Sequence, residues 1–170
     1  MRKLAILAVV LLAAAGAAGA QQAPSPNASP PPSPPPYGAP IDLARAENAI
    51  AAAVAEATRH GWTMGVAVVD SGANLVAFAR MDGTQLAAAV IAEHKARAAA
   101  AFRRPTRAFE DAARNGAGVL SLDGAIASAG GVPLIADGKL IGAIGCSGGT
   151  SAEDETTCLA GAATINGAAN

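Results

Sequence analysis

The sequence has few of the residues that nucleic-acid-binding proteins rely on. Its 170 residues include only three Phe, one Trp and one Tyr, and 12 Lys and Arg are balanced by 13 Asp and Glu, for a net charge of −1. Proteins that bind nucleic acids place basic patches against phosphates and aromatic side chains against bases. The composition therefore argues against a nucleic-acid partner.

Cysteine and histidine are equally scarce, with two of each. There is no C-x-x-C pair and no spacing typical of a zinc site. Cys146 is expected at the end of a strand and Cys158 in the final helix. The two could pair, as cysteines of exported proteins do, or remain buried free thiols; their apolar neighbours favour the free thiols.

The first twenty residues have the three parts of a secretory signal peptide. Met1-Arg2-Lys3 is basic, residues 4–15 are apolar, and Ala18-Gly19-Ala20 is a small-residue cleavage site. The apolar run is too short to cross a bilayer. We therefore expect residues 1–20 to be removed, the mature chain to have no membrane span, and the protein to be periplasmic or secreted.

Residues 21–40 contain nine of the eleven prolines and predict an extended, semi-rigid linker without a core. The folded domain is then expected over residues 41–170. Without Arg2 and Lys3, ten basic residues face thirteen acidic ones, a net charge of −3. The domain is long enough to bury a hydrophobic core.

Hydrophobic periodicity and turn residues predict a mixed fold. A helix should begin at Asp42 and end before Gly61, and Asp137-Gly138 should form a two-residue hairpin turn. The remaining expected elements are strands at 64–69 and 75–80, a helix at 85–102, a short helix capped by Thr106, a short strand at 125–128 and a helix at 152–165.

Helices therefore alternate with hairpins along the chain. Strands joined by tight turns are antiparallel, and helices inserted between hairpins can cover both faces of one sheet. The prediction is an α+β sandwich with an antiparallel sheet of about five strands and helices on both faces.

The glycine-rich segment 145–149 contains a G-x-S-x-G match around Ser147. An α/β-hydrolase requires a histidine after this serine, and none follows, so the match does not indicate a hydrolase. Backbone amides of residues 147–150 could instead hold a carboxylate or phosphate ahead of the final helix. The acidic residues at 153–155 favour capping, and Ser151 with Asp154 resembles a capping box.

His94 is the other candidate for chemistry. On a helix it shares a face with small and apolar residues, by three- and four-residue spacing: Val90, Ile91, Ala98, Ala101 and Phe102. Small neighbours leave room for a flat ring, so His94 could be an iron ligand. The alternative is an ordinary, partly exposed histidine beside a surface pair of Glu93 and Arg97.

Seven short motifs occur in order over nearly all of residues 42–167: Val66-Ala-Val-Val-Asp70-Ser-Gly72, Arg80-Met-Asp-Gly83, Lys95-Ala96, Pro105-Thr106, Gly130-Gly-Val-Pro133, Gly142-Ala-Ile-Gly145-x-Ser147-Gly148 and Asp154-Glu155. Together they resemble the GlcG/HbpS haem-binding family, which includes the C-terminal domain of PduO-type proteins. The resemblance implies a profilin-like sandwich, large homo-oligomers such as octamers, and haem or a related tetrapyrrole as ligand. Haem sensing, storage or degradation has been proposed for exported members.

The chain departs from the family at one position. The family commonly has Lys-Ala-x-Thr-Ala along the second helix, with the Thr implicated as a haem-iron contact, whereas this chain has Lys95-Ala96-Arg97-Ala98-Ala99. Ala98 cannot ligate iron. The resemblance thus implies a haem site at His94, Lys95, Ala98 and Phe102. Because Ala98 has no ligating atom, we expect either that His94 is the metal ligand or that haem binds weakly or not at all.

Three functions are consistent with the sequence. The first is an exported haem-binding protein. The second is an enzyme acting on a small oxygenated metabolite, with Lys95, Asp154 or Glu155 as acid and base in a pocket between subunits. The third is a scaffold module without a ligand.

Overall fold

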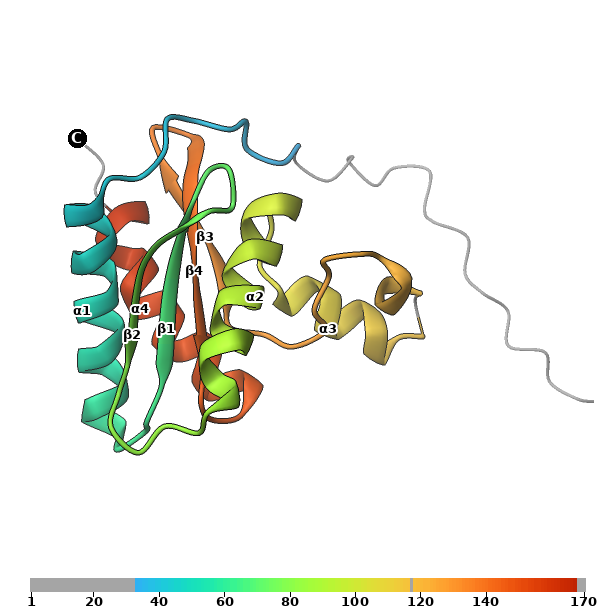
Figure 1. The fold of residues 1–170 in the computed structure, drawn as a ribbon. Helices are drawn as coiled ribbons and strands as arrows, with labels where there is room; N and C mark the ends of the chain where they lie inside the picture. The colour runs from blue at the N-terminus through green and yellow to red at the C-terminus, as the bar shows by residue number, and fades with distance from the viewer. Residues whose placement is uncertain (1–32, 117, 168–170) are drawn as a thin grey trace, which may run out of the picture. The chain divides into compact units, whose positions relative to one another are not determined.

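The computed structural model describes residues 33–116 and 118–167. The expected signal peptide and the linker up to residue 32 lie outside the described residues. Within them, one antiparallel sheet is covered by helices on both faces (Figure 1), as the sequence predicts.

The sheet contains β1 (Gly65–Asp70), β2 (Leu75–Arg80), β3 (Gly131–Ala136) and β4 (Lys139–Ser147), in the order β2-β1-β4-β3. Four strands are described rather than about five, because residues 125–128 form a loop. The polar groups of this region bind side chains instead of a neighbouring strand: the Ala129 amide donates to Glu110 and the Ser128 hydroxyl contacts Ser151.

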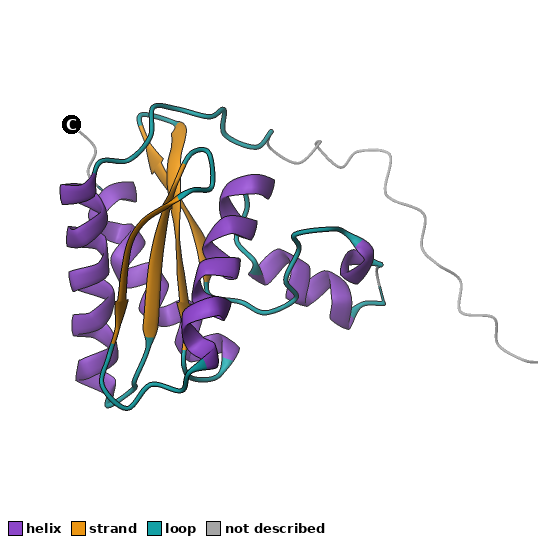
Figure 2. Cartoon of the chain, viewed as in Figure 1, coloured by secondary structure: helices purple, strands orange, loops and turns teal. Residues whose placement is uncertain are grey.

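Helices α1 (Leu43–His60) and α4 (Ser151–Asn166) pack together on one face of the sheet, and α2 (Ala87–Phe102) packs on the other. Helix α3 (Arg107–Arg114) and the 3-10 turn η1 (Val119–Ser121) lie beyond α2, away from the sheet (Figure 2). Among the described residues, no helix is both long and apolar enough to cross a membrane.

Helix α1 begins and ends as expected. The Asp42 carboxylate accepts a hydrogen bond from the Arg45 amide, and Gly61 ends the helix with a φ of 72°. The predicted two-residue turn between β3 and β4 is also present, since both Asp137 and Gly138 have positive φ, 50° and 70°. This is the turn geometry that Asp-Gly favours.

Helix α2 rests with its backbone almost directly on the sheet. A Cβ at Gly145 would lie 2.5 Å from the Ala96 amide nitrogen and would also collide with the Ala92 carbonyl. A Cβ at Gly131 would collide with the Lys95 carbonyl. Glycine on β3 and β4 therefore allows a close approach that fixes which residues of α2 face inward.

The last residues of the predicted linker are bound to the domain. Pro36 and Gly38 exchange backbone hydrogen bonds with Leu140 at the start of β4, at 2.8 and 2.7 Å. The Tyr37 hydroxyl donates to the Ala101 carbonyl at 2.9 Å, and the Arg103 guanidinium lies over the Tyr37 ring. Residues 36–38, which the sequence assigns to the linker, are therefore attached to the folded domain.

Cys146 and Cys158 form a disulfide between β4 and α4, with their Cα atoms 5.6 Å apart. The prediction of two free thiols is wrong. Both cysteines are fully buried, as expected, but the tight turn after β4 folds α4 back over the strand and brings the two sulfurs together.

Replacing both Cys146 and Cys158 with alanine should lower the free energy of unfolding by about 2–4 kcal/mol, because the disulfide restricts the unfolded chain. Urea denaturation of both forms measures the difference. Thiol titration of the unfolded but unreduced wild type serves as the control. Two reactive thiols per chain in that sample would contradict the assignment.

Candidate functional site

A buried ion pair joins α2 to α4. The Lys95 ammonium donates to an Asp154 carboxylate oxygen at 2.6 Å, and the two side chains are only 1% and 4% exposed. Charges are rarely buried to this extent unless they are paired. This pair is the most deeply buried charged cluster among the described residues, and it lies beside the end of β4.

The surrounding backbone is shaped to admit the pair. Gly130 has a φ of 112°, and a Cβ there would lie 2.7 Å from the Cβ of Asp154 and 3.2 Å from the Lys95 amino group. Gly149 donates its amide to the second carboxylate oxygen of Asp154 at 3.0 Å. Glycine at position 130 therefore leaves the space that the two charged side chains fill.

Burial raises the pKa of the Asp154 carboxyl above its ordinary value. The Lys95 ammonium and the amides of Gly149 and Gly148 act in the opposite direction, since they stabilise the carboxylate. Lys95 and Asp154 are thus bound to each other and are both shielded from solvent.

The amides ahead of α4 are occupied by the chain itself. The Thr150 hydroxyl accepts from the Glu153 amide, and the Glu153 carboxylate accepts from the Thr150 amide at 2.7 Å. This is a capping box. The prediction that these residues cap the helix, rather than bind an anion, is confirmed. The expected pair of Ser151 and Asp154 is wrong, because Asp154 turns inward to Lys95 and the capping box begins one residue earlier, at Thr150.

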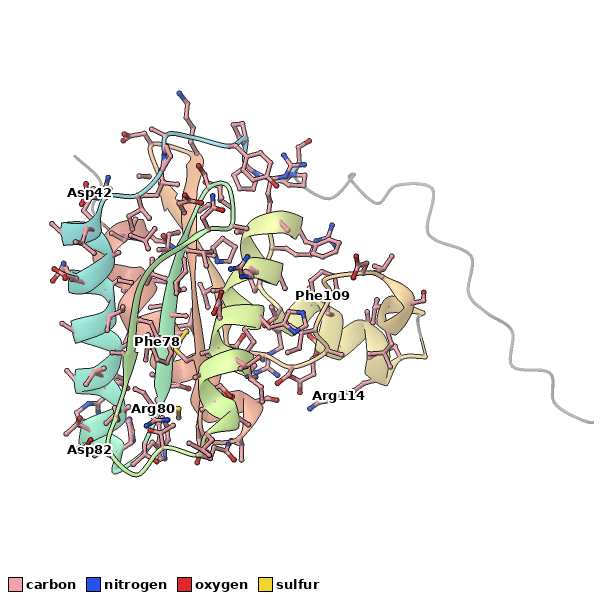
Figure 3. The ribbon with its side chains drawn as sticks, in the orientation of Figure 1. Asp42, Phe78, Arg80, Asp82, Phe109 and Arg114 are labelled. Carbon is pink, nitrogen blue, oxygen red and sulfur yellow. A yellow bond between two sulfur atoms is a disulfide. The ribbon has the colours of Figure 1, made fainter. Side chains whose placement is uncertain are left out.

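Polar contacts also fasten α3 and its following loop to the sheet and α4. Thr106 does not cap α3, contrary to the prediction; its hydroxyl accepts from the Gly131 amide at 2.9 Å. The buried Glu110 carboxylate accepts from the Ala129 amide at 2.7 Å and pairs with Arg114, and Arg107 pairs with Glu155. Figure 3 shows Arg114 and Phe109 on this helix.

Sequence reasoning missed Glu110. A single acidic residue on a short polar helix carries no motif, and its partner is a backbone amide 19 residues away. Burial would raise the pKa of Glu110, but the Ala129 amide and the charges of Arg114 and Arg107 outweigh it, so that the pKa lies below its ordinary value.

His94 lies on the outer, solvent-exposed side of α2. Together with Val90, Glu93 and Arg97 it lines an open pocket of about 310 Å³. Arg97 donates its Nε to Glu93 at 2.9 Å, as expected for a surface pair. His94 is therefore accessible to a ligand from solvent.

The other three predicted ligand residues do not line this pocket. Lys95 points inward to Asp154, and Ala98 is only 1% exposed. Phe102 is half-buried and packs edge-on against Phe109, with ring centroids 4.9 Å apart. The grouping of His94, Lys95, Ala98 and Phe102 in one ligand site stays a prediction.

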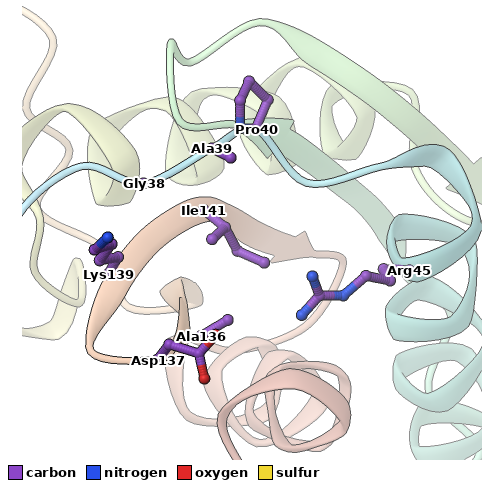
Figure 4. A pocket seen from close by; sticks show the side chains of 8 residues that line it. All are labelled: Gly38, Ala39, Pro40, Arg45, Ala136, Asp137, Lys139 and Ile141. Atoms are coloured by element: carbon purple, nitrogen blue, oxygen red, sulfur yellow. The ribbon is translucent and has the colours of Figure 1, made fainter.

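Two further pockets lie elsewhere on the domain. One, of about 270 Å³, is bordered by residues 38–40, by Arg45 of α1 and by Asp137 and Lys139 of the hairpin (Figure 4). The other, of about 380 Å³, is mostly apolar and lies against β3 and Leu159 of α4. No group of three or more His, Cys, Asp or Glu with metal-site geometry occurs in residues 33–116 and 118–167.

The described residues form an α+β domain in which a four-stranded antiparallel sheet lies between helical layers. The buried Lys95–Asp154 pair joins these layers. The family model described as "Haem degrading protein HbpS-like" matches residues 41–163. The chain belongs to this HbpS-like family.

Individual relatives agree with this assignment. Protein GlcG of Escherichia coli K12 is 41% identical over 99 residues, which is 58% of this chain and 74% of GlcG. A double mutant of Streptomyces reticuli HbpS has a TM-score of 0.70 and 29% identity, covering 83% of this chain and 99% of that one. A crystal structure of a PduOC–haem complex has a TM-score of 0.69 and 27% identity, covering 75% and 96%.

Replacing Lys95 with methionine should lower the free energy of unfolding by about 3–5 kcal/mol, because it leaves a buried carboxylate without its partner. The double variant Lys95→Met/Asp154→Asn should be more stable than Lys95→Met alone, since the asparagine oxygen can still accept from Gly149 without carrying a charge. Urea denaturation of the three proteins measures this. A double variant less stable than Lys95→Met would contradict the pairing.

Glu110 should contribute stability that depends on pH. Because its folded pKa lies below the unfolded value of about 4.3, the folded chain binds fewer protons in that window, and its stability rises with pH. The contribution is present above about pH 4.3 and is lost as the pH falls through the folded pKa. Glu110→Gln should therefore destabilise the protein more at pH 7 than at pH 3. Asp111→Asn, on the exposed side of the same helix, is the control, and an equal loss at both pH values would contradict the prediction.

Proposed function

We propose that this protein binds haem or a related tetrapyrrole at the His94 pocket. The observation that carries the proposal is an accessible imidazole on the outer face of α2 in a chain of the HbpS-like family. A relative of the same fold, PduOC, forms a complex with haem.

The residues of this pocket fit such a ligand. A histidine nitrogen is a common axial ligand of haem iron, and Val90, 74% exposed, offers an apolar surface beside it. Ala98 has no ligating atom and is buried, so His94 is the iron ligand in this proposal. Bound haem would supply its iron for ligand binding or redox chemistry, while the chain holds and orients it.

We also propose that the protein is exported and forms homo-oligomers. The basic and apolar leader at residues 1–20 supports export. The disulfide between Cys146 and Cys158 supports it independently, because disulfides persist in oxidising compartments. In this proposal the exported protein senses, stores or degrades the haem that it binds.

Binding is favoured over catalysis by the way the charged residues are used. An acid or base has to reach its substrate, but Lys95 and Asp154 are buried against each other and Glu155 is paired with Arg107. The candidate acid and base groups of an enzyme are thus engaged in holding the fold.

Titration of haemin into the wild type should give a shifted Soret band that saturates. His94→Ala should lose the shift or weaken binding at least about tenfold, because a coordinate bond to iron is lost. His60→Ala is the matched control: His60 is the other histidine, and it lies at the end of α1, stacked on Trp62. The same spectrum and affinity in wild type and His94→Ala would exclude His94 as the ligand.

A further inference from the structure

The pocket beside the β3–β4 hairpin is built from three separate segments of the chain. Residues 38–40 form one wall, α1 supplies Arg45, and the hairpin supplies the other lining residues, among them Asp137 and Lys139. The pocket shares no lining residue with the pocket around His94. Its volume of about 270 Å³ suits a small metabolite, since pockets for drug-sized ligands commonly measure about 300–1,000 Å³.

The wall formed by residues 38–40 is fastened at both of its ends. The Gly38 amide donates to the Leu140 carbonyl at 2.7 Å, and the Ile41 amide donates to the Ile141 carbonyl at 2.8 Å. A Cβ at Gly38 would lie 2.9 Å from the Cβ of Lys139, so the wall rests directly on the stem of that lysine. The pocket is thus formed before a ligand arrives, and binding does not have to order this segment.

Three charged side chains surround the pocket without neutralising one another. Arg45 extends into it from the first turn of α1, while Asp137 and Lys139 lie on the hairpin side (Figure 4). Within the described part of the chain, no ion pair joins Asp137 to Arg45 or to Lys139. The pocket therefore offers both a carboxylate and cationic groups to a ligand.

Apolar surface lies between these charges. Ile141 is only 6% exposed and belongs to the main core cluster, so it is a fixed part of the pocket. It lies two residues after Lys139 on β4, and alternate residues of a strand face the same side of the sheet. Ala39, Pro40 and Ala136 add further apolar surface.

This combination of groups selects a class of ligand. An arginine guanidinium binds a carboxylate through two parallel hydrogen bonds. A ligand with only a negative charge would be repelled by Asp137, and a ligand with only a positive charge would be repelled by Arg45 and Lys139. A small zwitterion carries both charges and meets neither repulsion.

We propose that this pocket binds a free α-amino acid with an apolar side chain. Its carboxylate pairs with Arg45, and Lys139 adds positive charge on the same side of the sheet. Its ammonium pairs with Asp137, and its side chain packs on the apolar surface around Ile141. The proposal is independent of haem binding, because the two pockets are separate.

NMR titration of the isotope-labelled full chain with L-leucine tests the proposal. The amides of Gly38, Gly138 and Ile141 should shift and saturate, with a Kd of about 1 mM or below. Isocaproate, which is leucine without its ammonium, and isoamylamine, which is leucine without its carboxylate, should each bind at least about tenfold more weakly.

Two variants separate the roles of the charges. Arg45→Gln should weaken leucine binding at least about tenfold, because the partner of the carboxylate is lost. Asp137→Asn should also weaken it and should abolish the preference for leucine over isocaproate. Asn-Gly favours the same two-residue turn as Asp-Gly, so this variant keeps the hairpin.

Arg59→Gln is the matched control, since Arg59 lies at the other end of α1 and pairs with Glu56. This variant and His94→Ala should both bind leucine with the wild-type affinity. The proposal is overturned if leucine gives no saturable shift, if isocaproate binds as tightly as leucine, or if Arg45→Gln keeps the wild-type affinity. Loss of leucine binding in His94→Ala would also overturn it, because the ligand would then occupy the other pocket.

Discussion

The contact on which the rest of the structure depends is the backbone-to-backbone approach of α2 to the sheet. Gly145 and Gly131 have no side chains to hold the helix away, and small residues line the inner side of the helix. Because the helix lies so close, its rotation is fixed to within a residue. That rotation turns Lys95 toward the interior and leaves His94, the preceding residue, in solvent.

Two different links then hold α4 to the sheet and to the helix on the opposite face of the sheet. The disulfide joins α4 to β4, and the Lys95–Asp154 pair passes the end of β4 to join α4 to α2. Gly130 lies where both links meet, since its missing Cβ would contact Asp154 and the Cys146 carbonyl. A side chain at position 130 would therefore disturb both the disulfide and the Lys95–Asp154 ion pair.

Local signals in the sequence predicted the local structure well. Asp42, Gly61 and the Asp137-Gly138 turn act within a few residues of themselves, so that capping and turn rules apply directly. The features that sequence reasoning missed all join distant segments: the disulfide, the Glu110–Ala129 bond and the inward turn of Asp154. Periodicity placed His94 and Ala98 on one face of α2; in the structure His94 is exposed and Ala98 is buried.

The attachment of residues 36–41 to β4 determines where force enters the domain. Tension applied through the chain ahead of residue 33 would not pull on α1, although α1 is the next element in sequence. It would first load the hydrogen bonds to Leu140 and Ile141 and the Tyr37 contact with the end of α2. The domain therefore has a mechanical anchor at the hairpin end of β4, beyond the residues of β4 that pair with β1, and α1 is protected from peeling until that anchor is released.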